Sequence, residues 1–246
     1  MDVSEVPLVG GHPAMDLVNT RERGAPAPGA EPHDHLADPA ALLVWARRAG
    51  LAGDAEAEAV AEAWERAPGA AQAALAATRD IRESLYVGLL ATAGLAPVEA
   101  GERSAALDRL HSRWVAAAGR SALAPEPGGA APARLAVGTV PALLVPDRAV
   151  DSALDLLRTA DVSRVRRCPT ENGGCGWVFL DRSRNGSRKW CRMADCGAEV
   201  KARRLTERRR AVRAGRPESP ERLERLERPA AEPRPQPPSP SPSQSY

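Results

Sequence analysis

Four cysteines towards the C-terminal end of the chain could bind a metal ion. Cys168, Cys175, Cys191 and Cys196 follow the spacing C-x6-C-x15-C-x4-C, and the chain has no other cysteine. Two close pairs separated by a hairpin-sized segment can converge on one ion, and four thiolates are the ligands of a structural zinc site. Because sulfur would fill every position, none would stay open for water or substrate. We therefore expect one structural Zn²⁺ and no catalytic zinc.

Two disulfides in a secreted protein are the alternative interpretation of these cysteines. That alternative expects a signal peptide, whereas the first seven residues, MDVSEVP, are acidic and precede no apolar segment of that kind. Cysteines of a disulfide scaffold would also be spread along the chain rather than gathered in one cluster. No run of about 18 apolar residues predicts a membrane helix. We expect a cytoplasmic protein with zinc-bound thiols and no membrane partner.

The residues around the cysteines are strongly basic. Between Arg164 and Arg216 there are 16 Lys and Arg against five Asp and Glu, although the whole chain carries a net charge of only +2. Such a charge split is typical of a module that binds a polyanion, and phosphate contacts dominate nucleic-acid affinity. The candidate contacts form two clusters: Arg182, Arg184, Arg188 and Lys189, and Lys201, Arg203, Arg204 and Arg208. A solvated basic helix without a partner is the alternative for the second cluster.

Short elements must position these basic side chains. The dipeptide Asn185-Gly186 favours a two-residue turn, so residues 177–181 and 187–191 are predicted to pair as a hairpin with the first cluster at its tip. The composition of residues 199–213 favours a helix that carries the second cluster. Three aromatic residues are expected to form the small core that a metal-held module needs, rather than to stack on bases. These are Trp177, Phe179 and Trp190.

Residues 1–161 are predicted to form a mainly helical domain. Ala, Leu and Val recur there at helical spacing, and aromatic residues make up only 3% of the chain. Asp38-Pro39 is typical of a helix start, with an N-cap followed by proline at the first helical position. Residues 54–66 and 70–93 are also predicted to be helices, the second of them long and packed on one side.

A hairpin, the zinc module and a tail complete the predicted architecture. Apolar runs at residues 134–140 and 142–145, on either side of Pro141, predict a small β-hairpin in the first domain. Residues 162–213 form the predicted zinc module of a hairpin and a helix. Residues 214–246 are rich in Pro and Ser and cannot bury a core, so they are predicted to be disordered. The predicted fold class is therefore mainly α (α+β).

Two parts of the sequence resemble known families. The segment WVFLDRSRNGSRKWCRMADCG (residues 177–197), preceded by Arg167-Cys168, resembles the CGNR zinc finger. The segments GGHPAMDLVNT (residues 10–20) and RESLY (residues 82–86) resemble the ABATE domain, which accompanies this finger in bacterial stress-induced transcriptional regulators. The resemblance implies zinc binding by the four cysteines and DNA binding in transcriptional control.

The residues after the last cysteine depart from the signature of the finger. The family's Cys-Gly-Asn-Arg stands here as Cys196-Gly197-Ala198-Glu199. The zinc ligand is kept, but a carboxylate replaces a cation. Glu199 would lie in the first turn of a helix, where the helix dipole favours a negative charge by roughly 0.3–1 kcal/mol. We expect the change to affect nucleic-acid contacts more than the zinc site.

A group of polar residues marks the N-terminal domain. Asp16, Asn19 and Thr20 lie close together at the end of an apolar stretch, and the simplest interpretation is that they cap or fix the loop that follows. The alternative is a polar corner of a small-ligand pocket, completed by Arg82. The sequence lacks a nucleophile elbow, a P-loop and a dinucleotide-binding fingerprint, so we expect no enzyme.

Two functions are compatible with these features. The first is a transcription regulator whose zinc module binds double-stranded DNA and whose helical domain receives a small-molecule effector or a protein partner. The second is a zinc-stabilised module that binds RNA or an acidic protein surface without sequence-specific DNA contacts. A steep fall of binding with salt would favour the first function.

Overall fold

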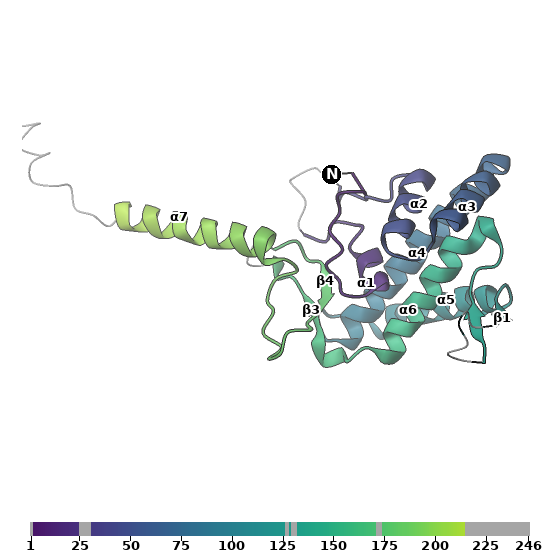
Figure 1. Cartoon of the computed structure of the whole chain (residues 1–246). Helices are drawn as coiled ribbons and strands as arrows, with labels where there is room; N and C mark the ends of the chain where they lie inside the picture. The colour runs from purple at the N-terminus through teal and green to yellow at the C-terminus, as the bar shows by residue number, and fades with distance from the viewer. Residues whose placement is uncertain (1, 25–30, 126–127, 129–131, 171–173, 215–246) are drawn as a thin grey trace, which may run out of the picture. The chain divides into compact units, whose positions relative to one another are not determined.

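The computed structural model describes residues 2–24, 31–125, 128, 132–170 and 174–214 (Figure 1). The chain divides into two compact units, and the division falls between Lys201 and Ala202. The tail that the sequence predicts to be disordered begins at residue 214, and residues 215–246 lie outside the described part. None of the described helices is both long and apolar enough to cross a membrane.

Helices dominate the described residues, as the sequence predicts. The helix predicted for residues 54–66 is confirmed at both ends. Asp38 is confirmed as an N-cap, because its carboxylate accepts a hydrogen bond from the backbone N–H of Ala41 at 2.8 Å. The helices are α1 (Pro13–Val18), α2 (Pro39–Arg48), α3 (Asp54–Arg66), α4 (Pro68–Thr92), α5 (Ala100–Ala118), α6 (Leu144–Thr159) and α7 (Ala198–Ala214).

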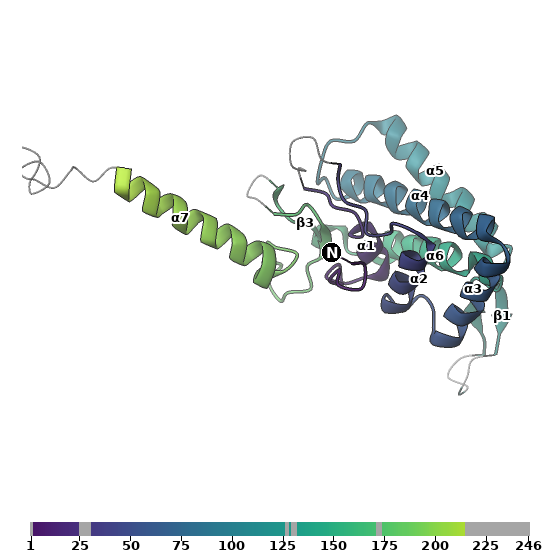
Figure 2. The same ribbon diagram turned by 90° about the horizontal axis from the view of Figure 1, so that it is seen from above.

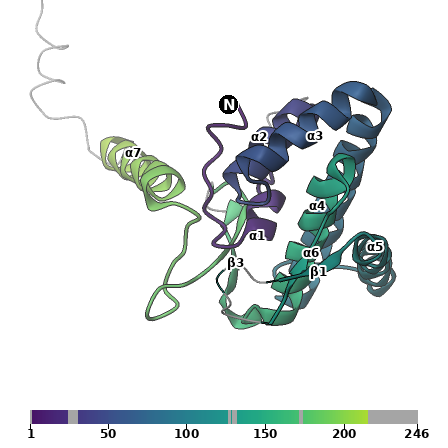
Figure 3. The same cartoon turned by 45° about the vertical axis from the view of Figure 1, so that its right-hand side comes forward.

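The long helix α4 lies at the centre of the helical domain. Helices α4, α5 and α6 contact one another in pairs, and the short helix α1 lies against α4 and α6 (Figures 2 and 3). Ile81, Leu85 and Leu89 recur every four residues on α4 and are all buried. This spacing places them on one face of the helix, as the sequence predicts. The small residues between them, Ser84 and Gly88, are also buried and let the neighbouring helices pack closely.

The predicted hairpin of the helical domain exists, but its strands are different. Strand β1 (Ala122–Ala124) pairs antiparallel with β2 (Arg134–Ala136). The prediction of a second strand at residues 142–145 is wrong. Pro141 starts the 3-10 turn η1 (Pro141–Leu143), which leads directly into α6. A proline fixes φ and has no N–H to donate to a strand, so it suits the start of a helical turn.

The hairpin predicted for the zinc module is also paired differently. Strand β4 (Val178–Leu180) pairs antiparallel with β3 (Val165–Arg167), and not with residues 187–191. The buried carboxylate of Asp181 accepts hydrogen bonds from the backbone N–H groups of Ser183 and Arg188 at 2.9 and 3.0 Å. These bonds fold the chain after β4 into a compact loop, so it does not return along β4 as a strand.

Candidate metal centre

The four cysteine sulfurs lie together in space. Their Sγ atoms are all within 4.8 Å of one another. The Sγ atoms of Cys175 and Cys191 are 3.3 Å apart, and those of Cys191 and Cys196 are 3.7 Å apart. Zinc–sulfur bonds of about 2.3 Å in a tetrahedron place sulfurs about 3.8 Å apart. The donor set therefore fits one zinc ion held by four thiolates.

The first pair of cysteines is brought together by the β3–β4 strand pair. Cys168 follows β3, and its backbone N–H donates to the carbonyl of Trp177 at 2.8 Å, which continues the ladder. The turn between the strands demands glycine at Gly176. Its φ is +76°, and a Cβ there would lie 2.6 Å from the carbonyl oxygen of Arg23. No other residue fits such a position without displacing the backbone.

The second pair lies at the entrance to α7. Cys191 precedes, and Cys196 belongs to, a single π-helical turn, η4 (Met193–Gly197). Cys168 and Cys191 are buried, whereas Cys175 and Cys196 keep part of their surface accessible. The metal is therefore reached from the side of Cys175 and Cys196.

The electrostatics of the sulfur cluster require a cation. Hydrogen bonds from the thiols of Cys175 and Cys191 lower the pKa of Cys168 to about 2. The hydrogen bonds to Cys168 raise the pKa of Cys175 and Cys191 in turn. Four thiolates at this separation repel one another, so they ionise together only around a positive ion. Zinc would supply that charge and cross-link the two cysteine pairs.

Aromatic residues form the small core beneath the metal centre, as the sequence predicts. Trp177, Phe179 and Trp190 belong to one cluster with the cysteines. The sequence interpretation missed the contribution of the N-terminal segment, because Val6 and Val9 pack in the same cluster. These valines come from more than 150 residues earlier in the chain. No local pattern in the sequence could indicate that contact.

Arg188 has a structural role that the sequence did not predict. Its guanidinium carbon lies 4.3 Å from the centre of the Phe179 ring. Its nitrogens donate to the backbone carbonyls of Trp190 at 3.1 Å and Val9 at 3.0 Å, and also to that of Cys191. Arg188 was predicted to contact nucleic acid, but these bonds occupy it inside the module. It joins the N-terminal segment to the second cysteine pair.

The other predicted nucleic-acid contacts are exposed. Arg182, Arg184 and Lys189 lie in the loop that follows β4, and Lys201 lies on the first turns of α7. In the second compact unit, α7 continues with six exposed arginines: Arg203, Arg204, Arg208, Arg209, Arg210 and Arg213. The first three of these are the predicted nucleic-acid contacts on this part of the helix.

The polar group of the N-terminal domain is buried. Asn19 donates to the carbonyl of Val178 and accepts from its N–H, both at 2.9 Å. Arg82 binds Asp34 through two hydrogen bonds of 2.6 and 2.7 Å and also reaches the hydroxyl of Thr20 at 3.2 Å. These contacts match the predicted structural role of the group. The small-ligand role stays a prediction.

Asp16 is the member of this group whose carboxyl group has a shifted pKa. Burial raises the pKa of its carboxyl to about 6, although the backbone N–H of Gly10 donates to it at 2.8 Å. Burial outweighs the backbone hydrogen bonds, because a carboxyl group removed from solvent favours its neutral, protonated form.

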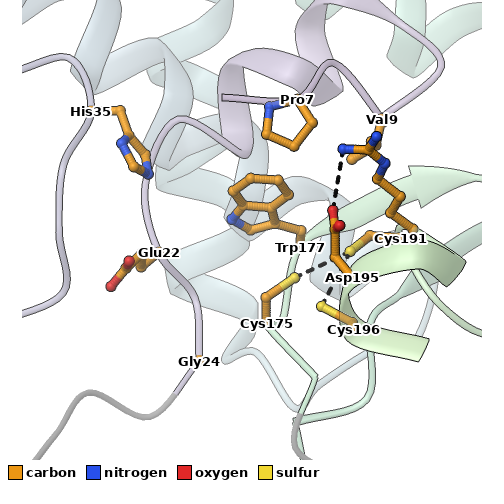
Figure 4. Close-up of a pocket in the computed structure, with 11 residues that line it drawn as sticks. Pro7, Val9, Glu22, Gly24, His35, Cys175, Trp177, Cys191, Asp195 and Cys196 are labelled. Atoms are coloured by element: carbon orange, nitrogen blue, oxygen red, sulfur yellow. Dashed lines mark hydrogen bonds and ion pairs between the residues drawn. The ribbon is translucent and has the colours of Figure 1, made fainter. Parts of the chain in front are cut away.

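A cavity of about 310 Å³ adjoins the sulfur cluster (Figure 4). Its lining includes Cys175, Cys191 and Cys196 together with Trp177 and five residues of the N-terminal region, Pro7, Val9, Glu22, Gly24 and His35. Sequence reasoning missed this cavity, because its walls come from parts of the chain that only the fold brings together.

Comparison with protein families assigns both parts of the chain. Residues 164–209 match the model of the CGNR zinc finger, and residues 11–165 match ABATE, described as "Putative stress-induced transcription regulator". No curated protein matches the chain. The finger match covers all four cysteines, and the ABATE match covers more than half of the chain. The chain therefore belongs to the ABATE family and carries a CGNR zinc finger whose four cysteines hold one structural zinc ion.

Proposed function

We propose that the protein is a DNA-binding transcription regulator and not an enzyme. The zinc ion fixes the fold of the finger, and exposed arginines contact the phosphates of double-stranded DNA. The basic part of α7 is the observation that carries this proposal. From Ala202 to Ala214 it has six arginines and one acidic residue, Glu207, and every charged side chain there is exposed.

The charge of α7 favours a polyanionic partner on physical grounds. Arg204 and Arg208, and likewise Arg209 and Arg213, are four residues apart and therefore neighbours on the helix surface. Like charges at this spacing destabilise a helix by about 0.2–0.5 kcal/mol per pair. Phosphates bound along the helix would relieve that repulsion. We therefore expect DNA both to bind α7 and to increase its helicity.

The test compares two triple variants of the zinc-loaded full chain. The first replaces Arg208, Arg209 and Arg213 by Gln, and the control replaces three exposed arginines of the first unit, Arg66, Arg103 and Arg134. Affinity for a random DNA duplex is measured by fluorescence anisotropy over a range of salt concentrations. Three lost phosphate contacts reduce the slope of log K against log salt by about 2.7. An unchanged slope would remove α7 from the contact surface.

The helical domain is proposed to pass a signal to the finger. Asn19 at the end of α1 supports this proposal, because its amide binds both backbone groups of Val178 on β4. A shift of α1 on effector binding would thus move β4 and the residues just before it, Cys175 and Trp177. Hydrogen exchange at Val178 with and without a candidate effector tests this coupling.

A protein-binding role of α7 is the second candidate function. Leu205 and Val212 are 50% and 70% exposed and lie seven residues apart, on one face of the helix. Such a stripe can pack on a partner helix. A pull-down that still recovers partners after nuclease treatment, together with an absence of duplex binding at low salt, would favour this function over DNA binding.

A further inference from the structure

The cavity beside the zinc site has an apolar floor and a charged rim. Pro7, Val9 and the ring of Trp177 form its floor, and Figure 4 shows Pro7 beside the indole ring. Trp177 is only 8% exposed, so its position is fixed by the surrounding structure. A volume of about 310 Å³ matches the lower end of the range for small-molecule sites. The floor suits a compact apolar guest.

The charges around the cavity are predominantly negative. A zinc ion with four thiolates carries two negative charges, and three of these thiolates line the cavity. Glu22 and Asp195 add two more at the exposed rim, against one positive charge on Arg192, which pairs with Asp195 at 3.3 Å. Arg188 does not line the cavity, and if its positive charge is added, the sum of the charges around the cavity is still negative.

The combination of an aromatic floor and negative charge selects a class of guest. Cations are attracted to the face of an indole ring as well as to carboxylates and zinc-bound thiolates. An anion would meet repulsion from the same groups. We infer that this cavity is a binding site for a compact organic cation with an apolar body, such as a quaternary ammonium ion. The guest would contact the metal centre through Cys175 and Cys196.

The experiment uses a charge series of small aromatic probes on the zinc-loaded full chain. Benzyltrimethylammonium, benzyl alcohol and phenylacetate are titrated by calorimetry at pH 8 and at low ionic strength. We expect saturable binding of the cation at one site, weaker binding of the alcohol and no binding of phenylacetate. Equal binding of all three probes, or no saturable binding of the cation at millimolar concentrations, would overturn the inference.

Two rim variants with opposite expected effects make the test specific. Glu22→Gln removes a negative charge and should weaken cation binding about two- to fivefold, because both partners lie near solvent. Arg192→Gln removes a positive charge and should strengthen it by a similar factor. Glu58→Gln, on the exposed face of α3, is the matched control. If neither rim variant changes the affinity in its expected direction, the cation does not occupy this cavity. No nucleic acid is present, so the outcome is independent of DNA binding.

Discussion

The buried carboxyl of Asp16 gives the protein a specific dependence of stability on pH. Its pKa is about 6 in the folded chain and 3.8 in its unperturbed state. Between these values the folded state binds more protons than the unfolded state, so the contribution of Asp16 to stability falls as pH rises. The loss is complete above about pH 6.

Asp16→Asn should remove this dependence, because the amide oxygen keeps the bond to Gly10 without a charge. The free energy of unfolding of the variant minus that of the native chain should rise by about 1.4 kcal/mol from pH 5 to pH 8. Urea unfolding of both proteins across that range measures the difference. A constant difference at every pH would show that Asp16 is not the titrating group.

The sequence predicted the roles of some single residues well, but not the role of every one. The cysteines could be assigned from spacing alone, because metal coordination demands four sulfurs close together. Asp38 could be assigned from local capping chemistry. Arg188 could not, since its sequence context reveals a positive charge but not which carbonyls its guanidinium meets. Those carbonyls belong to Val9 as well as to Trp190 and Cys191, and the first is distant in sequence.

Between elements, the amide of Asn19 is the principal polar link from α1 to β4. It satisfies the N–H and the carbonyl of Val178 in a buried environment. Asn19→Ala leaves both backbone groups unpaired, and each unpaired buried group costs about 1–3 kcal/mol. For the two groups together we expect a loss of roughly 2–6 kcal/mol in the free energy of unfolding.

Denaturant unfolding of the zinc-loaded chain measures that loss. Asn185→Ala is the control, because Asn185 is exposed in the loop after β4 and its truncation should change stability by less than about 0.5 kcal/mol. If the two variants were equally stable, the link between α1 and β4 would not be an important constraint.

Strand pairing was the part of the element pattern that the sequence could not specify. Asn185-Gly186 does form a turn, with Gly186 at φ +60°, yet the strands it was expected to join do not pair. A turn signal fixes the local chain direction, whereas pairing depends on which neighbour satisfies the backbone. Here Asp181 binds the N–H of Arg188, and β3 supplies the partner for β4.

At the scale of the first compact unit, the helical domain and the finger share one hydrophobic core. Val165 on β3 and Val178 on β4 belong to the same cluster as Leu17 and Val18 of α1. The two family matches also overlap at residues 164 and 165, where β3 begins. Residues Met1–Lys201 form one compact unit as a result. Zinc binding and the folding of the helical domain should therefore be thermodynamically linked.

Cys175→Ser tests this linkage, because the loss of one thiolate should release the zinc. Elemental analysis measures the metal, and calorimetry measures the unfolding of the helices. We expect the helices to persist at 25 °C but to unfold at a lower temperature, by about 2–4 °C for each kcal/mol of lost contact. The same substitution in an Asn19→Ala background should cause a smaller further decrease, since the link from α1 to β4 is already weakened. A helical transition that is unaffected by zinc loss would mean that the finger and the helical domain fold independently.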